Sequence, residues 1–207
     1  LIGLFGRILP AGFYYKTFMT PNRLWPIYER IIRQAAGLGR APSDPDPDRY
    51  ENINTHCDIL IIGGGPSGLS AALKAGQSGA RVILADEQNE FGGALLGSDD
   101  EIDGGPALDW VEKTVGELEE IAEVRLLPRT TIFGYYNHNF LTAVERVTDH
   151  LGVSDDPLPR QRSWRIRARQ VILASGAIER PMVFENNDRP GVMLASAAST
   201  YVKRYGV

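Results

Sequence analysis

The feature that most constrains the fold is a cluster of glycines that directly follows a short apolar run. Residues 58–62 are mainly aliphatic and β-branched, which is typical of a parallel strand buried on both faces. In the next segment, Gly63-Gly64-Gly65-Pro66-Ser67-Gly68, the residues Gly63, Gly65 and Gly68 fit the pattern G-x-G-x-x-G. The sequence therefore predicts a strand, a tight glycine turn and a helix over 67–77, which together begin a βαβ unit.

Each glycine of this pattern has a separate task. Gly63 permits the tight turn out of the strand, Gly65 lets the backbone approach a pyrophosphate, and Gly68 lets the helix pack closely on the sheet. The free N–H groups and the positive dipole end of the helix would then stabilise the phosphate charge without a lysine. A glycine-rich surface turn explains the glycines alone, so the residues that follow have to decide between the two interpretations.

The spacing of an acidic residue favours a dinucleotide site. A second apolar strand is predicted over 81–85, and Asp86 ends it, about 20 residues after the glycines, where a carboxylate accepts hydrogen bonds from both ribose hydroxyls. Glu87 and Gln88 extend the same loop over the adenosine side, although a solvated acidic turn is the alternative for these two. Asp86 would repel a 2′-phosphate, which disfavours NADP and leaves NAD and FAD open.

Three further segments resemble parts of the flavoproteins that bind two dinucleotides. Phe91-Gly92-Gly93-Ala94-Leu95 is similar to the GG loop that follows the ribose-binding acid, so Gly93 and Ala94 are expected to line the pocket. The segment 171–176 resembles the strand that ends in Ala-Thr-Gly in those proteins, with Ser175 in place of the threonine before Gly176. A simple tight turn is the alternative at Gly176. Ile132 lies in a segment expected to run along the adenine.

The rest of the chain completes an α/β fold. Residues 24–35 have helical apolar spacing, and 41–48 form an acidic, proline-spaced linker. A helix is expected over 109–122, and strand-like runs over 124–136, 140–148 and 162–173. The predicted fold class is a Rossmann-like FAD/NAD(P)-binding domain with a β-meander insertion, preceded by a helical segment and the linker. The expected boundaries are 1–49 for the helical segment with its linker and 50–207 for the Rossmann-like domain.

Composition excludes several classes of function. With 22 basic and 26 acidic residues the net charge is −4, so no broad positive field attracts nucleic acid or anionic lipid. No apolar run approaches the roughly 18 residues of a membrane helix. A single cysteine, Cys57, excludes an internal disulfide framework and a CxxC pair, and it fits a reducing, cytoplasmic location. His56, His138 and His150 lack metal-ligand spacing, and no Ser-His-Asp set is identifiable, so neither a catalytic nor a metal site is predicted.

The chain resembles the alpha subunits of heterotetrameric sarcosine oxidases over nearly its whole length. The likeness rests on four segments, of which the first, Pro-Ala-Gly-Phe-Tyr-Tyr-Lys-Thr-Phe, is much narrower in distribution than the glycine pattern; they are residues 10–18, 36–42, 133–136 and 176–192. Because the chain begins without methionine and stops inside an apparent helix, we expect an internal fragment whose domain is incomplete at its carboxy end. The family's preceding domain and carboxy-terminal folate domain are expected to lie outside it.

The resemblance implies a function and a division of labour among subunits. The family oxidises sarcosine to glycine, passes the one-carbon unit to tetrahydrofolate or releases it as formaldehyde, and reduces oxygen to hydrogen peroxide. Its alpha subunit holds NAD, FAD lies in the beta subunit, and covalent FMN lies near the alpha–beta interface; gamma and delta subunits complete the complex. Carried over by position, the NAD contacts would be Ser67, Asp86, Glu87, Gln88, Ala94 and Ile132.

Two alternatives to this interpretation stay open. One is a related flavin dehydrogenase, of the opine oxidase or hydrogen cyanide synthase kind, in which the same site holds FAD. The other is a binding module whose nucleotide is purely structural.

Overall fold

A computed structural model describes residues 22–37, 39, 45–151 and 157–207. The chain divides between Pro47 and Asp48 into two compact units. In the first unit, a short 3-10 turn η1 (Asn22–Leu24) leads into helix α3 (Trp25–Ala35), which buries none of its residues. The segment 10–18 that carries the family resemblance, and part of the expected linker, lie outside the described residues.

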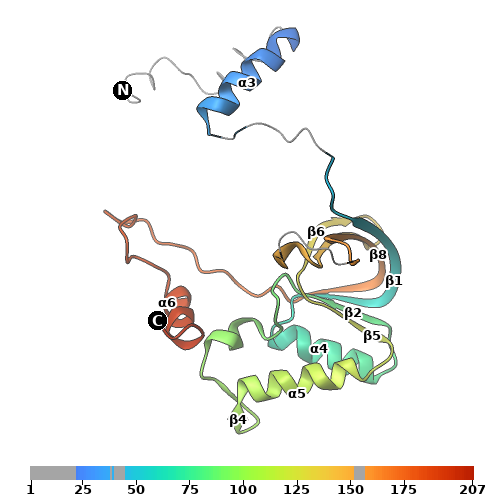
Figure 1. Ribbon diagram of the computed structural model, residues 1–207. Helices are drawn as coiled ribbons and strands as arrows, with labels where there is room; N and C mark the ends of the chain where they lie inside the picture. The colour runs from blue at the N-terminus through green and yellow to red at the C-terminus, as the bar shows by residue number, and fades with distance from the viewer. Residues whose placement is uncertain (1–21, 38, 40–44, 152–156) are drawn as a thin grey trace. The chain divides into compact units, whose positions relative to one another are not determined.

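The second unit is built on one mixed sheet (Figure 1), with the strand order β5-β2-β1-β8-β7-β6. Strands β5, β2, β1 and β8 are parallel to their neighbours, whereas β7 is antiparallel to both β8 and β6. The strands are β1 (Tyr50–Ile62), β2 (Val82–Ala85), β5 (Val124–Leu127), β6 (Thr130–Tyr136), β7 (Phe140–Arg146) and β8 (Gln161–Leu173). The fold is therefore the predicted Rossmann-like α/β fold, with β6, β7 and the first half of β8 as the meander.

Helices cover one face of the parallel strands (Figure 1). They are α4 (Pro66–Gln77) and α5 (Ala107–Glu119). The remaining elements are η2 (Gly93–Gly97), the β3–β4 pair (Glu101–Ile102 and Gly105–Pro106), η3 (Asp149–Leu151) and α6 (Ala195–Lys203). None of the described helices has the length and apolar character needed to cross a membrane.

Strand β2 shows how the two-residue period of a strand divides the core. Val82 and Leu84 pack toward the helices with Leu69 and Leu118, while Ile83 and Ala85 join the cluster on the opposite face. All four residues of β2 are buried, as expected of a parallel strand covered on both sides. The second cluster contains Leu60, Leu141, Trp164 and Ile166, so the meander closes the face that α4 and α5 leave open.

Strands β1 and β8 each run for 13 residues and join the two parts of the sheet. Residues 50–57 of β1 pair with β8 beside the antiparallel β7, and residues 59–62 pair with both β8 and β2. The sequence predicted only 58–62 as strand. The single strand-like run expected over 124–136 is two strands, because the chain turns at Pro128 and Arg129, and Arg129 has a positive φ of 53°.

Candidate dinucleotide site

The glycine loop lies at the carboxyl end of β1, between β2 and β8. Gly63 has a φ of 106°, and a Cβ atom there would overlap the carbonyl oxygen of Ala174 at the end of β8. A Cβ atom on Gly68 would overlap the carbonyl oxygen of Gly63, because α4 turns back closely over the loop. The first and third glycines of the pattern are thus required by the packing of the domain itself.

Gly65 differs from the other two glycines of the pattern. Its φ of −73° is open to any residue, and a Cβ atom there would meet no atom closer than the Cα of Gly93, at 3.9 Å. Neither backbone strain nor protein packing therefore requires glycine at this position. The space in front of Gly65 fits the close approach of a pyrophosphate, which is the task that the pattern assigns to it.

The N-terminus of α4 faces this space with free donors. The N–H of Leu69 donates to the carbonyl oxygen of Gly65 at 2.9 Å, which is the first hydrogen bond of the helix. Pro66 has no N–H, so the N–H groups of Ser67 and Gly68 precede that bond and have no intrahelical acceptor. The first turn of this 12-residue helix thus offers two donors and its positive dipole end to an anion.

The carboxylate of Asp86 links the glycine loop to the loop after β2. Its Oδ2 accepts the N–H of Gly64 at 2.5 Å, and its Oδ1 accepts the N–H of Gln88 at 2.7 Å. A carboxylate oxygen has a second lone pair, so each oxygen can still accept a ribose hydroxyl. Asp86 is half-buried, while the side chains of Glu87 and Gln88 are exposed.

The loop 86–88 is braced from the meander by contacts that sequence reasoning missed. Thr130 and Arg129 donate their N–H groups to the carbonyl oxygens of Asp86 and Gln88, both at 2.7 Å. The guanidinium of Arg146 donates to the carbonyl oxygen of Glu87 at 2.5 Å. Arg129 and Arg146 are far from the loop in sequence, and no local pattern marks them.

The GG loop packs directly on the glycine loop. The N–H of Gly92 donates to the carbonyl oxygen of Gly64 at 2.8 Å, and a Cβ atom on Gly93 would lie 2.9 Å from the Cα of Gly65. The ring of Phe91 covers Gly64 so closely that a Cβ atom there would overlap it. Ala94, the first residue after this contact, is exposed.

The end of β8 and strand β6 form the remaining predicted parts. The N–H of Ala174 bonds to the carbonyl oxygen of Ile62 at 2.8 Å, which brings the exposed Ser175 and Gly176 beside the glycine loop. Ile132 packs half-buried against the core cluster around Leu60, so only part of its side chain is left for an adenine. The structure thus gathers the glycine, acid and GG loops with Ser175, whereas Ile132 belongs mainly to the core.

The cysteine and the histidines lie outside this site. Burial, followed by the negative charge of Asp58, raises the pKa of Cys57 to about 11, so its thiol stays protonated and unreactive at neutral pH. The Nε2 of His56 lies 2.7 Å from a guanidinium nitrogen of Arg81. In the part of the chain that the structure describes, no three His, Cys, Asp or Glu side chains are arranged to hold a metal ion.

Comparison with known proteins places this site in a family. Residues 58–123 match the model of the FAD dependent oxidoreductases. The sarcosine oxidase alpha subunit of Rhizobium meliloti strain 1021 is 53% identical over 208 residues, covering 100% of this chain and 21% of that protein. This chain is a homologue of sarcosine oxidase alpha subunits. It spans about a fifth of the length of the relative it matches.

Two more distant proteins share the fold. An opine oxidase subunit from Rhizobium meliloti is 32% identical over 163 residues, which are 72% of this chain and 28% of that protein. The crystal structure of L-proline dehydrogenase from P. horikoshii superposes with a TM-score of 0.59 at 29% identity, covering 81% of this chain and 32% of that chain. The homologue of sarcosine oxidase alpha subunits therefore has a flavoprotein-type Rossmann-like fold.

Proposed function

We propose that this chain is the dinucleotide-binding part of the alpha subunit of a sarcosine oxidase complex. The complex would oxidatively demethylate sarcosine to glycine, pass the one-carbon unit to tetrahydrofolate or release it as formaldehyde, and form hydrogen peroxide. The observation that carries the proposal is 53% identity to a sarcosine oxidase alpha subunit over the whole chain. The opine oxidase relative, at 32% identity over part of the chain, supports the rival activity less.

NAD is the nucleotide that we assign to the site, with FAD as the rival. The open space at Gly65 and the N–H groups of Ser67 and Gly68 would hold the pyrophosphate, and Asp86 the ribose hydroxyls. Gly63 shapes the turn behind them. The remaining wall would consist of Glu87, Gln88, Gly93, Ala94, Ile132, Ser175 and Gly176.

The FAD alternative rests on a specific observation, because the family model matched by residues 58–123 is that of FAD dependent oxidoreductases. NAD supplies a hydride acceptor when bound, or structural support alone if it never turns over. In either case this chain's contribution is to bind the pyrophosphate and ribose and to orient the nucleotide. Asp86 disfavours a 2′-phosphate whichever of the two nucleotides binds.

The proposal assigns the remaining chemistry to other parts of a cytoplasmic complex. FAD and FMN would lie elsewhere in it, with beta, gamma and delta subunits as partners, and tetrahydrofolate would bind only through a carboxy-terminal domain. The family resemblance and the name of the relative, an alpha subunit, support this division. No nucleic acid or membrane partner is proposed.

The activity is tested on the full-length protein purified with its co-expressed partner subunits. We expect sarcosine to drive peroxide release and an opine such as octopine to leave the complex inactive. Peroxide release with octopine and not with sarcosine would assign the chain to the opine oxidase type. Spectra recorded during sarcosine turnover decide whether the nucleotide is redox-active, because a reducible nicotinamide changes its absorbance near 340 nm and a structural one does not.

A further inference from the structure

One surface outside the nucleotide site carries a regular row of arginines. On β8 the buried side chains of Trp164, Ile166 and Ala168 alternate with exposed ones. Because alternate side chains of a strand point to the same face, the exposed ones lie in one row on the outer face of the meander; they are Arg165, Arg167 and Arg169.

The neighbouring strands add no negative charge to this row. Arg165 pairs with Asn54 of β1 on one side and with Thr142 of β7 on the other. Arg167 pairs in the same way with His56 and Phe140. In strand β6, Gly134 and Tyr136 lie opposite Thr142 and Phe140 and extend the two rows. The face is therefore basic at its centre and aromatic at one side, without a carboxylate in either row.

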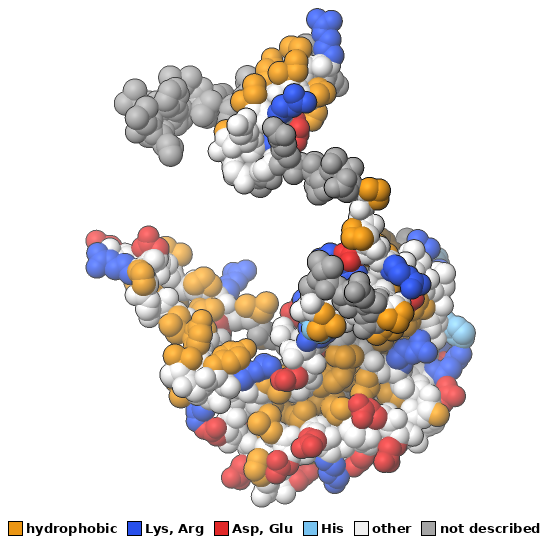
Figure 2. Space-filling view, viewed as in Figure 1, with side chains coloured by type: hydrophobic (Ala, Val, Ile, Leu, Met, Phe, Trp, Pro, Cys, Tyr) orange, Lys and Arg blue, Asp and Glu red, His pale blue; other side chains and the backbone are white. Residues whose placement is uncertain are grey.

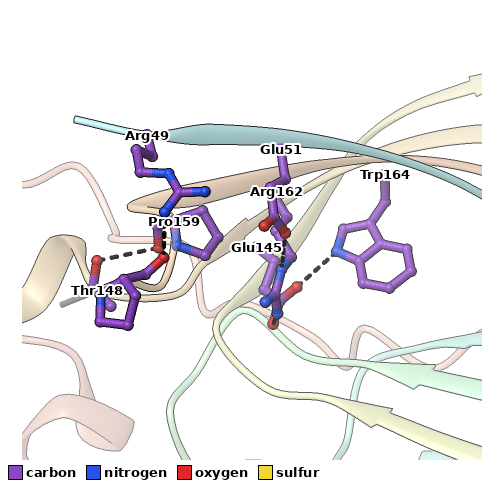
Figure 3. Close-up of polar contacts among 8 residues, drawn as sticks. Arg49, Glu51, Glu145, Thr148, Pro159, Arg162 and Trp164 are labelled. Carbon is purple, nitrogen blue, oxygen red and sulfur yellow. Dashed lines mark hydrogen bonds and ion pairs between the residues drawn. The ribbon is translucent and has the colours of Figure 1, made fainter. Parts of the chain in front are cut away.

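The nearest acidic side chains are already engaged with other groups. Glu51 and Glu145 bind Arg162, on the side of β8 that Trp164 occupies, at 2.8 and 3.5 Å, and Glu145 also accepts the indole N–H of Trp164 at 2.8 Å (Figure 3). Asp58, near Arg169, accepts three hydrogen bonds from Arg81. None of these carboxylates is left to neutralise the row.

Arg167 is also held in place on this face. Its guanidinium stacks over the ring of Phe140 at 5.1 Å and donates to the carbonyl oxygen of His138 at 3.1 Å. The ring of Tyr136 lies 5.9 Å from that of Phe140. A fixed guanidinium beside two aromatic rings is the composition found at the centres of protein–protein interfaces, where Arg, Tyr and Phe are enriched.

The charge of the domain decides which anionic partner fits. The chain has a net charge of −4, and its acidic side chains gather over α5, away from the strands β1 and β8 (Figure 2). A long polyanion such as nucleic acid would meet this negative field, whereas a protein surface with a few carboxylates meets only the row. The spacing along a strand, roughly 6.6 Å between alternate residues, suits separate carboxylates on a folded partner.

We propose that this arginine face, made of Arg165, Arg167 and Arg169 with His56, Phe140 and Tyr136, docks a carboxylate-bearing surface of another subunit of the same complex. The identity of the partner rests on the proposed function. The geometry of the face does not, because it follows from the register of β1, β8, β7 and β6. Opposite charges across such an interface accelerate association and set specificity.

The double substitution Arg165→Glu/Arg167→Glu tests the docking in the full-length protein, co-expressed with its partner subunits. Retained partners are counted by size-exclusion chromatography with light scattering, and the salt concentration that separates them is measured. We expect the docked partner to be lost at physiological salt, with an affinity at least tenfold lower. Arg165→Lys/Arg167→Lys keeps the charge and should retain the partner. Lys74→Glu/Lys113→Glu, on exposed positions of α4 and α5, makes the same charge change and should leave assembly intact.

Four outcomes separate the possible errors. An intact complex in Arg165→Glu/Arg167→Glu would overturn the docking face alone, since the proposed function would stand. Loss of assembly in Lys74→Glu/Lys113→Glu as well would mean that total charge and not this face governs association. A wild-type protein that purifies without partners would contradict both proposals. Binding of a fluorescent 20-nucleotide single-stranded DNA that only the arginine-to-glutamate variant loses would replace the protein partner with nucleic acid.

Discussion

A Cβ atom added at Gly63 or Gly68 would overlap backbone atoms of the domain, whereas one added at Gly65 would meet nothing closer than the Cα of Gly93, 3.9 Å away. Identical residues in one pattern therefore answer to different demands. The first and third glycines let the strand, turn and helix form. The second leaves room that the protein does not use, and its effect on binding can be separated from its effect on folding.

Replacing Gly65 with valine should abolish dinucleotide binding and leave the domain folded. The side chain would occupy the space needed by the pyrophosphate, while the backbone angle remains allowed. Far-UV circular dichroism checks the fold, and nucleotide released by denaturation is counted per chain. Gly116→Val on the outer side of α5, where a Cβ atom also meets nothing within 4 Å, is the matched control and should keep its nucleotide. Full occupancy of a folded Gly65→Val protein would sink the assignment of the site.

Replacing Asp86 with alanine should weaken NAD binding by about 1.5 to 3 kcal/mol, which is the range for hydrogen bonds to a charged group and corresponds to roughly tenfold to over a hundredfold in Kd. Discrimination against NADP should relax as well, because the repelling charge is gone. Calorimetry of both proteins against both nucleotides measures this. An unchanged affinity for NAD would show that Asp86 does not hold the ribose.

The structure adds a second consequence of that substitution. Asp86 also accepts the N–H groups of Gly64 and Gln88, so Asp86→Ala should lower the melting temperature of the nucleotide-free protein. Asp86→Asn separates the two roles, because its amide oxygen can still accept one backbone N–H without the charge. We expect Asp86→Asn to recover part of the thermal stability while its discrimination against NADP stays weak.

Among the elements, strand β1 shows where sequence reasoning is weaker. The apolar end 58–62 was predicted, but the preceding half alternates outward polar residues, Asn52, Asn54 and His56, with partly buried ones, and such a pattern is hard to distinguish from a polar loop. The glycine loop was predictable because each glycine answers to local geometry. The braces from Arg129 and Arg146 to the loop 86–88 were not, because hydrogen bonds between distant strands depend on the register of the whole sheet.

The junction of β1 with β2 should give stability a measurable pH dependence. Hydrogen bonds from Arg81 lower the pKa of Asp58 from 3.8 to about 2. Since the folded pKa lies below the unfolded value, the contribution of Asp58 is complete above the unfolded pKa and is lost as pH falls through the folded one. Asp58→Asn should therefore flatten the curve of unfolding midpoint against pH between about 4 and 2. Urea titrations of both proteins across this window test it, and parallel curves would refute the role of Asp58.

At the scale of the whole molecule, the chain supplies a nucleotide site and an arginine face, but it spans about a fifth of the length of its relative. We predict that residues 1–207 alone release no peroxide with sarcosine, with or without added FAD and NAD, because the proposal places the flavins and the amine-oxidising groups elsewhere in the complex. The assay is run beside the reconstituted complex, which should turn over. Sustained turnover by residues 1–207 would overturn the division of labour and direct attention back to the three histidines.

The most direct test of the central claim, that the loop around Gly65 holds NAD, is to identify the dinucleotide that the full-length protein carries. The wild-type and Gly65→Val proteins are purified under identical conditions and denatured, and the released nucleotides are separated by chromatography and identified by mass. We expect about one NAD per wild-type chain and none from Gly65→Val. Release of FAD in place of NAD from the wild-type protein, or equal amounts of NAD from both proteins, would contradict the claim.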